Sequence, residues 1–194
     1  MAEAVAAPAL GRLVVVGLGL IGGSFSKGLR DKGLFREVIG VDLDPESRRM
    51  AVELGVVDRC EEDLAAACVG ADVIQLAVPI LAMQKLLGAL AQLPLGDTVL
   101  TDVGSAKGNV VRAAALAFDG VPPRFVPGHP IAGSEQSGVE ASNGQLFRRH
   151  KVILTPLADT DGAALQMVDR LWRELGADVE HIVEMAGVGP VAAG

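Results

Sequence analysis

Short continuous runs of Val, Ile and Leu alternate along the chain with stretches whose apolar positions recur every three or four residues. The continuous runs indicate strands buried on both faces, because a strand with one solvated face would alternate apolar and polar residues. Strands are predicted at residues 12–17, 37–42, 72–78, 98–103 and 124–127. Helices are predicted to begin near Ile21, Pro45, Ile80 and Ala106, with a shorter one near Glu61. This alternation predicts an α/β fold with a parallel sheet and right-handed crossovers.

The end of the chain predicts one more strand–helix–strand unit. Residues 151–156 and 178–183 predict strands, and residues 161–175 predict an amphipathic helix that Gly176 ends. One face of that helix carries Leu165, Val168, Leu171, Trp172 and Leu175. Trp172 is therefore interpreted as a core residue rather than a site residue.

Composition narrows the possible partners. Half of the 194 residues are hydrophobic, enough to bury a substantial core. A net charge of −7 and an aromatic content of 3% argue against nucleic acid and anionic membranes. No apolar run approaches the roughly 20 residues of a membrane helix, and the opening residues form neither a signal peptide nor an anchor. We expect a soluble, cytoplasmic protein with a flexible tail at residues 1–11.

Cys60 and Cys68 are the only cysteines, and their spacing fits neither a CxxC motif nor a zinc site. We interpret them as ordinary small residues in a reducing compartment, and we expect no metal.

A glycine motif carries the first chemical signal. Gly17, Gly19 and Gly22 form GxGxxG directly after the first predicted strand and at the start of a helix. The three glycines allow a tight turn, a close approach of a pyrophosphate and close packing of helix on strand. Asp42 ends the second strand, where a carboxylate can hold the ribose hydroxyls of NAD. Together these features predict a Rossmann-type doubly wound fold that binds a dinucleotide.

The same Asp42 would repel a 2′-phosphate, so NAD is preferred over NADP. Arg48 and Arg49 follow closely, and we interpret them as a solvated helix face. The chain is too short for the usual FAD enzymes. Val78 and Pro79 close a predicted strand at the edge where ligands bind, although Pro79 is equally well explained as the start of the next helix. The predicted cofactor-binding residues are Gly17, Gly19, Leu20, Ile21, Gly22, Asp42, Val78, Pro79 and Ser105.

Two polar loops follow the last two strands of the predicted sheet. The segments TDVGSAKG and PGHPIAGSEQSG leave the same carboxyl edge as the glycine loop. Ser105, His129 and Glu135 should therefore converge on the nicotinamide end of a bound cofactor. Oxidation of an alcohol needs a proton acceptor, and a histidine is suited to that role near neutral pH. Lys107, in the first turn of a helix, is interpreted as solvated, and His150 and His181 as surface or strand residues.

With these motifs the chain resembles the prephenate and arogenate dehydrogenases of tyrosine biosynthesis. The resemblance rests on VVVGLGLIGGS, GVDLDPES, TDVGSAKG, GHPIAGSEQSGVEAS and LFRRHKVILTP, and it covers roughly residues 11–185. It implies that His129 accepts the proton of the substrate's ring hydroxyl and that Ser105 shares this hydroxyl. It also implies that Glu135 orders the pocket and that Ser134 contacts the substrate. The implied reaction is an NAD-dependent oxidative decarboxylation of prephenate, arogenate or both.

The resemblance also implies a further domain, which we expect to be absent from this chain. Members of the family continue into a helical domain that mediates dimerisation and binds the substrate's carboxylates, whereas here the match stops near Met185. We expect residues 12–185 to form the NAD-binding domain and residues 186–194 to be an unstructured end or the start of the missing domain. A homodimer, expected for full-length members, is doubtful for this chain. A non-catalytic NAD-binding module, or another reductase with a related nucleotide domain, remains an alternative.

Overall fold

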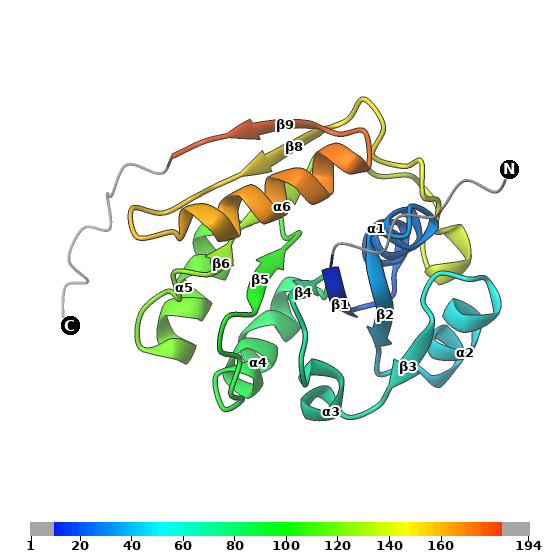
Figure 1. The fold of residues 1–194 in the computed structure, drawn as a ribbon, viewed down its shortest axis with the longest axis horizontal. Coiled ribbons are helices and arrows are strands. Elements are labelled where there is room, and N and C mark those ends of the chain that lie inside the picture. The colour runs from blue at the N-terminus through cyan, green and yellow to red at the C-terminus, as the bar shows by residue number, and fades with distance from the viewer. Residues whose placement is uncertain (1–9, 184–194) are drawn as a thin grey trace, which may run out of the picture.

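The computed structural model describes residues 10–183, and six parallel strands form its central sheet (Figure 1). In chain order these strands are β1 (Leu10–Val16), β2 (Phe35–Val41), β3 (Arg59–Glu61), β4 (Val73–Leu76), β5 (Val99–Asp102) and β6 (Phe125–Val126). Their spatial order is β3-β2-β1-β4-β5-β6. The order reverses between β1 and β4, which is where an open parallel sheet forms a ligand crevice at its carboxyl edge. The predicted doubly wound α/β fold is confirmed.

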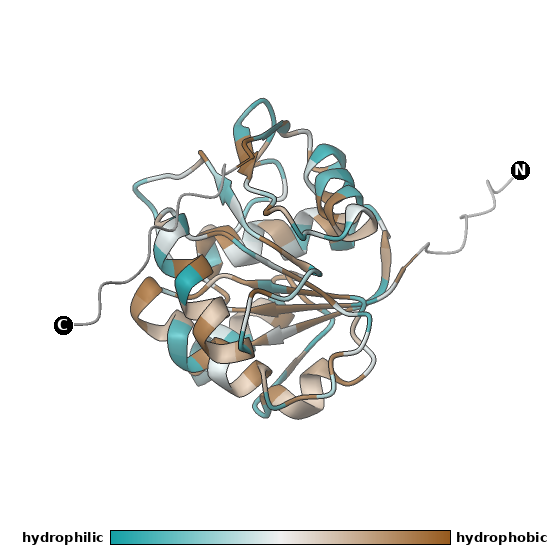
Figure 2. Ribbon diagram, turned by 90° about the vertical axis from the view of Figure 1, so that its left-hand side faces the viewer, coloured by the Kyte–Doolittle hydropathy of each residue, from teal (hydrophilic) through white to brown (hydrophobic). Residues whose placement is uncertain are grey.

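Helices cover both faces of this sheet. They are α1 (Leu20–Asp31), α2 (Pro45–Glu53), α3 (Leu64–Cys68), α4 (Ile80–Leu90), α5 (Lys107–Phe118) and α6 (Gly162–Glu174), with a 3₁₀ turn at Val139–Ala141. One core joins the sheet to α1, α2 and α6, and a second joins the opposite face to α3, α4 and α5. Figure 2 shows the hydrophobic strands running between the helical layers. The continuous apolar runs are therefore explained by burial on both faces.

The predicted terminal strand–helix–strand unit forms a second sheet instead of extending the first. Its strands are β7 (Gly128–Pro130), β8 (Lys151–Leu154) and β9 (Asp178–His181), with β7 antiparallel and β9 parallel to β8. Helix α6 buries Trp172 completely, with ring centroids 4.8 Å from Phe25 and 4.9 Å from Phe147. Gly176 follows α6 with a φ of +78°, as predicted for a residue that ends a helix. Trp172 is confirmed as a core residue that ties the second sheet to α1.

Several predicted boundaries are wrong, and each has a local cause. The helix expected near Glu61 begins at Leu64, because Asp63 caps it by accepting from the amides of Ala65 and Ala66. Glu61 instead ends the short strand β3, whose charged residues hid it in the sequence. The sequence predicts a loop at residues 128–130, because Gly and Pro are poor strand formers, but the structure has strand β7 there.

The predicted tail at residues 1–11 is too long, because Leu10 and Gly11 already belong to β1. The remainder of that tail and the predicted end at residues 186–194 lie outside the described residues. Between residues 10 and 183, none of the helices combines the length and the apolarity that crossing a bilayer would require.

Candidate functional site

The glycine loop between β1 and α1 passes very close to β4. Gly17 has a φ of +96°, and a Cβ added there would lie 2.3 Å from the carbonyl oxygen of Ala77. A Cβ on Gly22 would lie 2.1 Å from the carbonyl oxygen of Gly17. A side chain at either position would collide with backbone. These two glycines are therefore required by the fold itself.

Gly19 differs from its two partners because a Cβ there would meet nothing within 4 Å. Its φ of −79° is open to any residue, so neither strain nor packing explains a glycine at this position. The open space lies at the start of α1, where Gly19 is the N-cap and makes no side-chain cap hydrogen bond. The first amides of a helix and its positive dipole end favour an anion. Gly19 thus leaves room for a ligand to approach the backbone.

A cleft of about 690 Å³ opens at this point, between the glycine loop, the end of β2 and the start of α4. Its lining includes eight of the residues predicted to bind a cofactor, namely Gly17, Gly19, Leu20, Ile21, Gly22, Asp42, Val78 and Pro79. Ser105, the ninth, does not line the cleft, but the preceding Gly104 does. Most of the remaining wall is apolar, with the charged side chains of Glu62 and Lys85 at the cleft as well.

Asp42 has a structural task besides any ligand contact. One carboxylate oxygen accepts from the amide of Leu18 at 2.8 Å, and the other accepts from the amide of Asp44 at 2.9 Å. The first bond joins the end of β2 to the glycine loop. A carboxylate offers about four lone-pair positions, so two remain for a ligand's hydroxyl groups.

Of the two arginines interpreted as solvated, only Arg49 lies on an exposed helix face, where it pairs with Glu46 and Glu53. The interpretation of Arg48 as solvated is wrong, because its side chain is only 16% exposed. Arg48 donates to the carbonyl of Asp42 at 2.8 Å and pairs with Glu62 at 2.6 Å. The sequence did not reveal this tie, since Glu62 is brought opposite Arg48 only by the fold.

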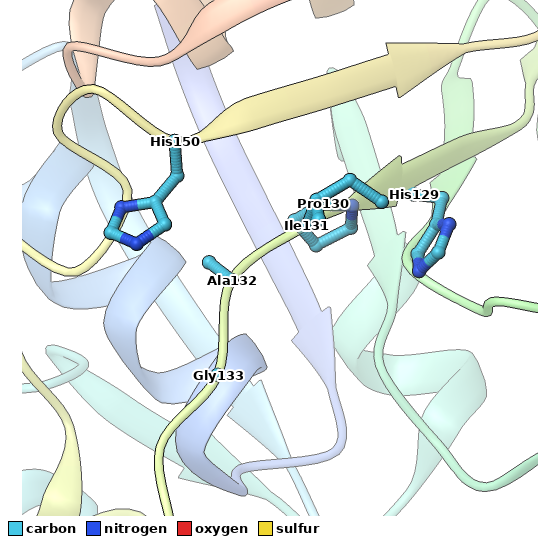
Figure 3. Close-up of a pocket in the computed structure, with 6 residues that line it drawn as sticks. All are labelled: His129, Pro130, Ile131, Ala132, Gly133 and His150. Carbon is cyan, nitrogen blue, oxygen red and sulfur yellow. The ribbon is translucent and has the colours of Figure 1, made fainter.

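His129 lies on β7, not in a loop as the sequence suggested, and it stands opposite Ile153 of β8 in the sheet register. It lines an open depression of about 430 Å³ together with Pro130, Ile131, Ala132, Gly133 and His150. Figure 3 shows His129 and His150 at opposite ends of this row of residues. Pairing with β8 fixes the backbone of His129 more firmly than a loop would.

Beside the backbone of Gly128, the residue that precedes His129, Asp102 and Lys107 form an ion pair that the sequence pattern did not predict. Asp102 accepts from the amides of Gly104 at 2.8 Å and Gly128 at 3.1 Å, and from the ammonium of Lys107. Lys107 also donates to the carbonyl of Gly128. The prediction that Lys107 is solvated is wrong, because the fold places a buried carboxylate and a carbonyl beside it. The sequence contained one signal for this pair: an acidic residue, Asp102, ends an apolar strand five positions before Lys107.

These surroundings shift the pKa values of Asp102, Lys107 and His129. Burial raises the pKa of Asp102 and lowers the pKa of Lys107, while their mutual contact opposes both changes. The three donors around Asp102 satisfy a carboxylate, which identifies the ionised form. Burial and the Lys107 ammonium lower the pKa of His129 from its ordinary value, and Asp102 acts in the opposite direction. The neutral imidazole, able to accept a proton, is favoured.

The other predicted catalytic and substrate residues, Ser105, Ser134 and Glu135, lie outside the linings of the two cavities. All three are exposed in the part of the chain that the structure describes. Ser134 accepts from the amide of Gln136 at 3.0 Å, as a serine in a turn does. Their predicted convergence on one site stays a prediction.

The remaining sulfur and imidazole groups have ordinary environments. Cys60 and Cys68 are free thiols, and burial raises the pKa of Cys68 to about 11. Such a thiol is a poor nucleophile at neutral pH. His150 and His181 are exposed, as expected, and His181 contacts Asp169 at 2.8 Å.

Comparisons with known proteins agree with this geometry. The family model described as prephenate dehydrogenase, nucleotide-binding domain, matches residues 25–181. A prephenate dehydrogenase of Bacillus subtilis is 35% identical over 178 residues, which are 90% of this chain and 46% of that protein. The chain spans between 40 and 56% of the length of its first three curated relatives.

Two solved structures share the fold. The prephenate dehydrogenase of Aquifex aeolicus in complex with hydroxyphenyl propionate and NAD+ is similar with a TM-score of 0.81 and 38% identity. The match covers 89% of this chain and 59% of that one. An arogenate dehydrogenase of Synechocystis gives a TM-score of 0.79 and 31% identity, with coverage of 89 and 59%.

Proposed function

This chain belongs to the prephenate dehydrogenase family as its nucleotide-binding domain, and we propose on that basis that it binds NAD. We further propose that it supplies the nucleotide-binding half of an enzyme that oxidatively decarboxylates prephenate, arogenate or both. The observation that carries the proposal is the cleft at the glycine loop. Two of its glycines are required by backbone contacts, and the third, Gly19, is required only if a ligand occupies the open space beside it.

The chemical groups of the cleft and their positions in it suit a dinucleotide. The amides at the start of α1, around Gly19 and Leu20, would bind the pyrophosphate. The two free lone-pair positions of Asp42 would accept from the ribose hydroxyls. Backbone at Val78 and Pro79 would line the nicotinamide side. When bound, NAD+ would supply the hydride acceptor that the oxidation needs.

Selectivity for NAD over NADP follows from the same corner of the cleft. Asp42 and Glu62 both line it, so a 2′-phosphate would meet two carboxylates. Arg48 would not compensate, because Asp42 and Glu62 already hold its guanidinium. We expect NADP+ to bind more weakly for this reason.

His129 is the proposed proton acceptor. Its imidazole is kept neutral by burial and by the charge of Lys107, so a ring nitrogen can take the proton of the substrate hydroxyl as the ring is oxidised and carbon dioxide leaves. In this proposal Ser105 shares that hydroxyl, while Ser134 and Glu135 shape the pocket. These three roles are carried by the family resemblance.

Both substrates are proposed because one related structure is of a prephenate dehydrogenase and another of an arogenate dehydrogenase. We propose that the chain acts in tyrosine biosynthesis in the cytoplasm. We also propose that a helical domain and a homodimer, as expected for full-length members of the family, complete the substrate pocket.

Calorimetry of this 194-residue chain with NAD+ and NADP+ tests the first proposal. NAD+ should bind and NADP+ should bind more weakly, and absence of NAD+ binding would overturn the proposal. NADH absorbance with prephenate and with arogenate then tests the activity. Little or no turnover is expected without groups to pair the substrate carboxylates, since misplacement by about 1 Å can cost roughly 100-fold in rate. Robust turnover by the monomeric chain would show that our account of the pocket is wrong.

A further inference from the structure

A buried ion pair lies between the nucleotide cleft and His129, and the proposed function does not require it. The side chain of Asp102 has no exposed surface, and that of Lys107 is 13% exposed. Removing two charges from water is costly, so a buried ion pair is by itself weak evidence of a gain in stability. A pair kept in this position therefore calls for an explanation other than stability.

The contacts of the pair suggest what it does. Asp102 binds the amide of Gly104, which lines the nucleotide cleft, and the amide of Gly128, which directly precedes His129. Lys107 binds the carbonyl of the same Gly128. One carboxylate thus spans both sites, and the pair holds both backbone polar groups of the residue before His129.

The space around these contacts allows little displacement. A Cβ on Gly104 would lie 3.1 Å from a carboxylate oxygen of Asp102, and a Cβ on Gly128 would lie 3.0 Å from the backbone oxygen of Asp102. Both glycines let the backbone close around the pair. Asp102 therefore links the backbone of the cleft directly to the backbone that precedes His129.

We propose that the buried pair Asp102–Lys107 is a positioning device, which fixes His129 relative to the nucleotide cleft and places a fixed positive charge beside its imidazole. The role of this pair in catalysis rests on the proposed function, but its effect on the His129 imidazole does not. The ammonium of Lys107 opposes protonation of the ring, so His129 stays ready to accept a proton.

The charges that act on His129 come from two elements. Lys107 stands at the start of α5 and Asp102 at the end of β5, and Lys107 has the stronger effect on the pKa of His129. Strand β8 presents the apolar Ile153 opposite His129, and His150 lines the far end of the depression. Removing Lys107 should therefore raise the pKa of His129.

An NMR titration of the imidazole carbon-bound protons tests this proposal on the chain itself. The chain has three histidines, and the signal missing from His129→Gln identifies the resonance of interest. Lys107→Gln should move the His129 midpoint to higher pH, and Lys107→Arg should restore it. Lys27→Gln, which removes a lysine paired with Asp31 on α1, is the matched control and should leave the midpoint in place.

If Lys107→Gln does not fold, the double variant Asp102→Asn/Lys107→Gln keeps the test open. It removes both charges and should still raise the midpoint, although by less, because the ammonium outweighs the carboxylate. A His129 midpoint unchanged in every folded variant would overturn the proposal. Calorimetry with NAD+ on the same proteins distinguishes failure of this proposal from failure of the proposed function. A chain that does not bind NAD+ would contradict the proposed function, whereas the titration result would still hold.

Discussion

Gly19→Ala should separate binding from folding more cleanly than any other substitution in the glycine loop. The new methyl group would enter open space at a φ of −79°, so no clash or strain is expected. Alanine is a poorer N-cap than glycine by roughly 0.5–1 kcal/mol, but it also lowers the entropy of the unfolded chain by an effect of about 0.4–1 kcal/mol. The two nearly cancel, and the melting temperature should change by less than about 4 °C.

The effect of Gly19→Ala on NAD+ should be much larger. A methyl group in the space beside the first amides of α1 would keep the pyrophosphate from one charge-assisted hydrogen bond, worth roughly 1.5–3 kcal/mol. The dissociation constant should therefore rise roughly 10- to 100-fold, since about 1.4 kcal/mol corresponds to a factor of ten. Calorimetry with NAD+ measures this change directly.

Two other glycine variants complete the experiment. Gly17→Ala combines a positive φ with a methyl group 2.3 Å from the carbonyl oxygen of Ala77. It should lower the free energy of unfolding by roughly 2–5 kcal/mol from strain and overpacking. Gly88→Ala, in the interior of α4 with nothing within 4 Å of the new Cβ, is the control for affinity. It should keep NAD+ affinity and raise the free energy of unfolding by about 0.5–1 kcal/mol, because alanine is the better residue in a helix interior. If Gly19→Ala bound NAD+ as tightly as the unaltered chain, the open space would not be a pyrophosphate site and the reasoning would fail.

Four further predictions concern single side chains. Asp42→Ala should weaken NAD+ binding by about 1.5–3 kcal/mol in calorimetry and reduce discrimination against NADP+, and unchanged affinity would mean that the ribose is held elsewhere. His129→Ala should lower kcat by about 10²–10⁴ in a longer protein that shows turnover, with NAD+ affinity retained, and a normal kcat would exclude His129 as the proton acceptor. Trp172→Ala should cost roughly 3–5 kcal/mol in denaturant unfolding followed by circular dichroism, and a loss below about 1 kcal/mol would contradict its place in the core. The folded state holds the pKa of His129 below its ordinary 6.5, so the unfolded chain binds the proton more readily and stability should fall as the pH drops below 6.5, a dependence that His129→Gln should reduce in pH-dependent unfolding.

The elements that the sequence predicted well are those decided by local pattern. Residues 12–17 and 37–42 lie close to β1 and β2, because an uninterrupted Val and Ile run has few alternatives to a buried strand. The glycine loop was also predictable, since Gly17 and Gly22 are needed wherever a strand turns directly into a packed helix.

The elements that were missed depend on partners far away in the sequence. Strand β7 exists because β8, more than 20 residues later, offers its backbone to Gly128 and Pro130. Lys107 is buried because Asp102 and the carbonyl of Gly128 meet it from two different strands. The hydrogen bond from the amide of Leu18 to Asp42 depends on the turn at Gly17, and the residue types alone do not predict it. Roles for Ser105 and Glu135 came from resemblance, and local pattern alone could not place them.

The burial of Trp172 gives the molecule a built-in optical probe. The chain has one tryptophan and no tyrosine, so light absorbed near 295 nm is emitted from this single position. The indole is held between Phe25 of α1 and Phe147, and its emission should therefore report whether α6 stays packed on α1. A shift of that emission to longer wavelength, ahead of any loss of helical signal, would mark the second sheet and α6 as the part of the molecule that opens first.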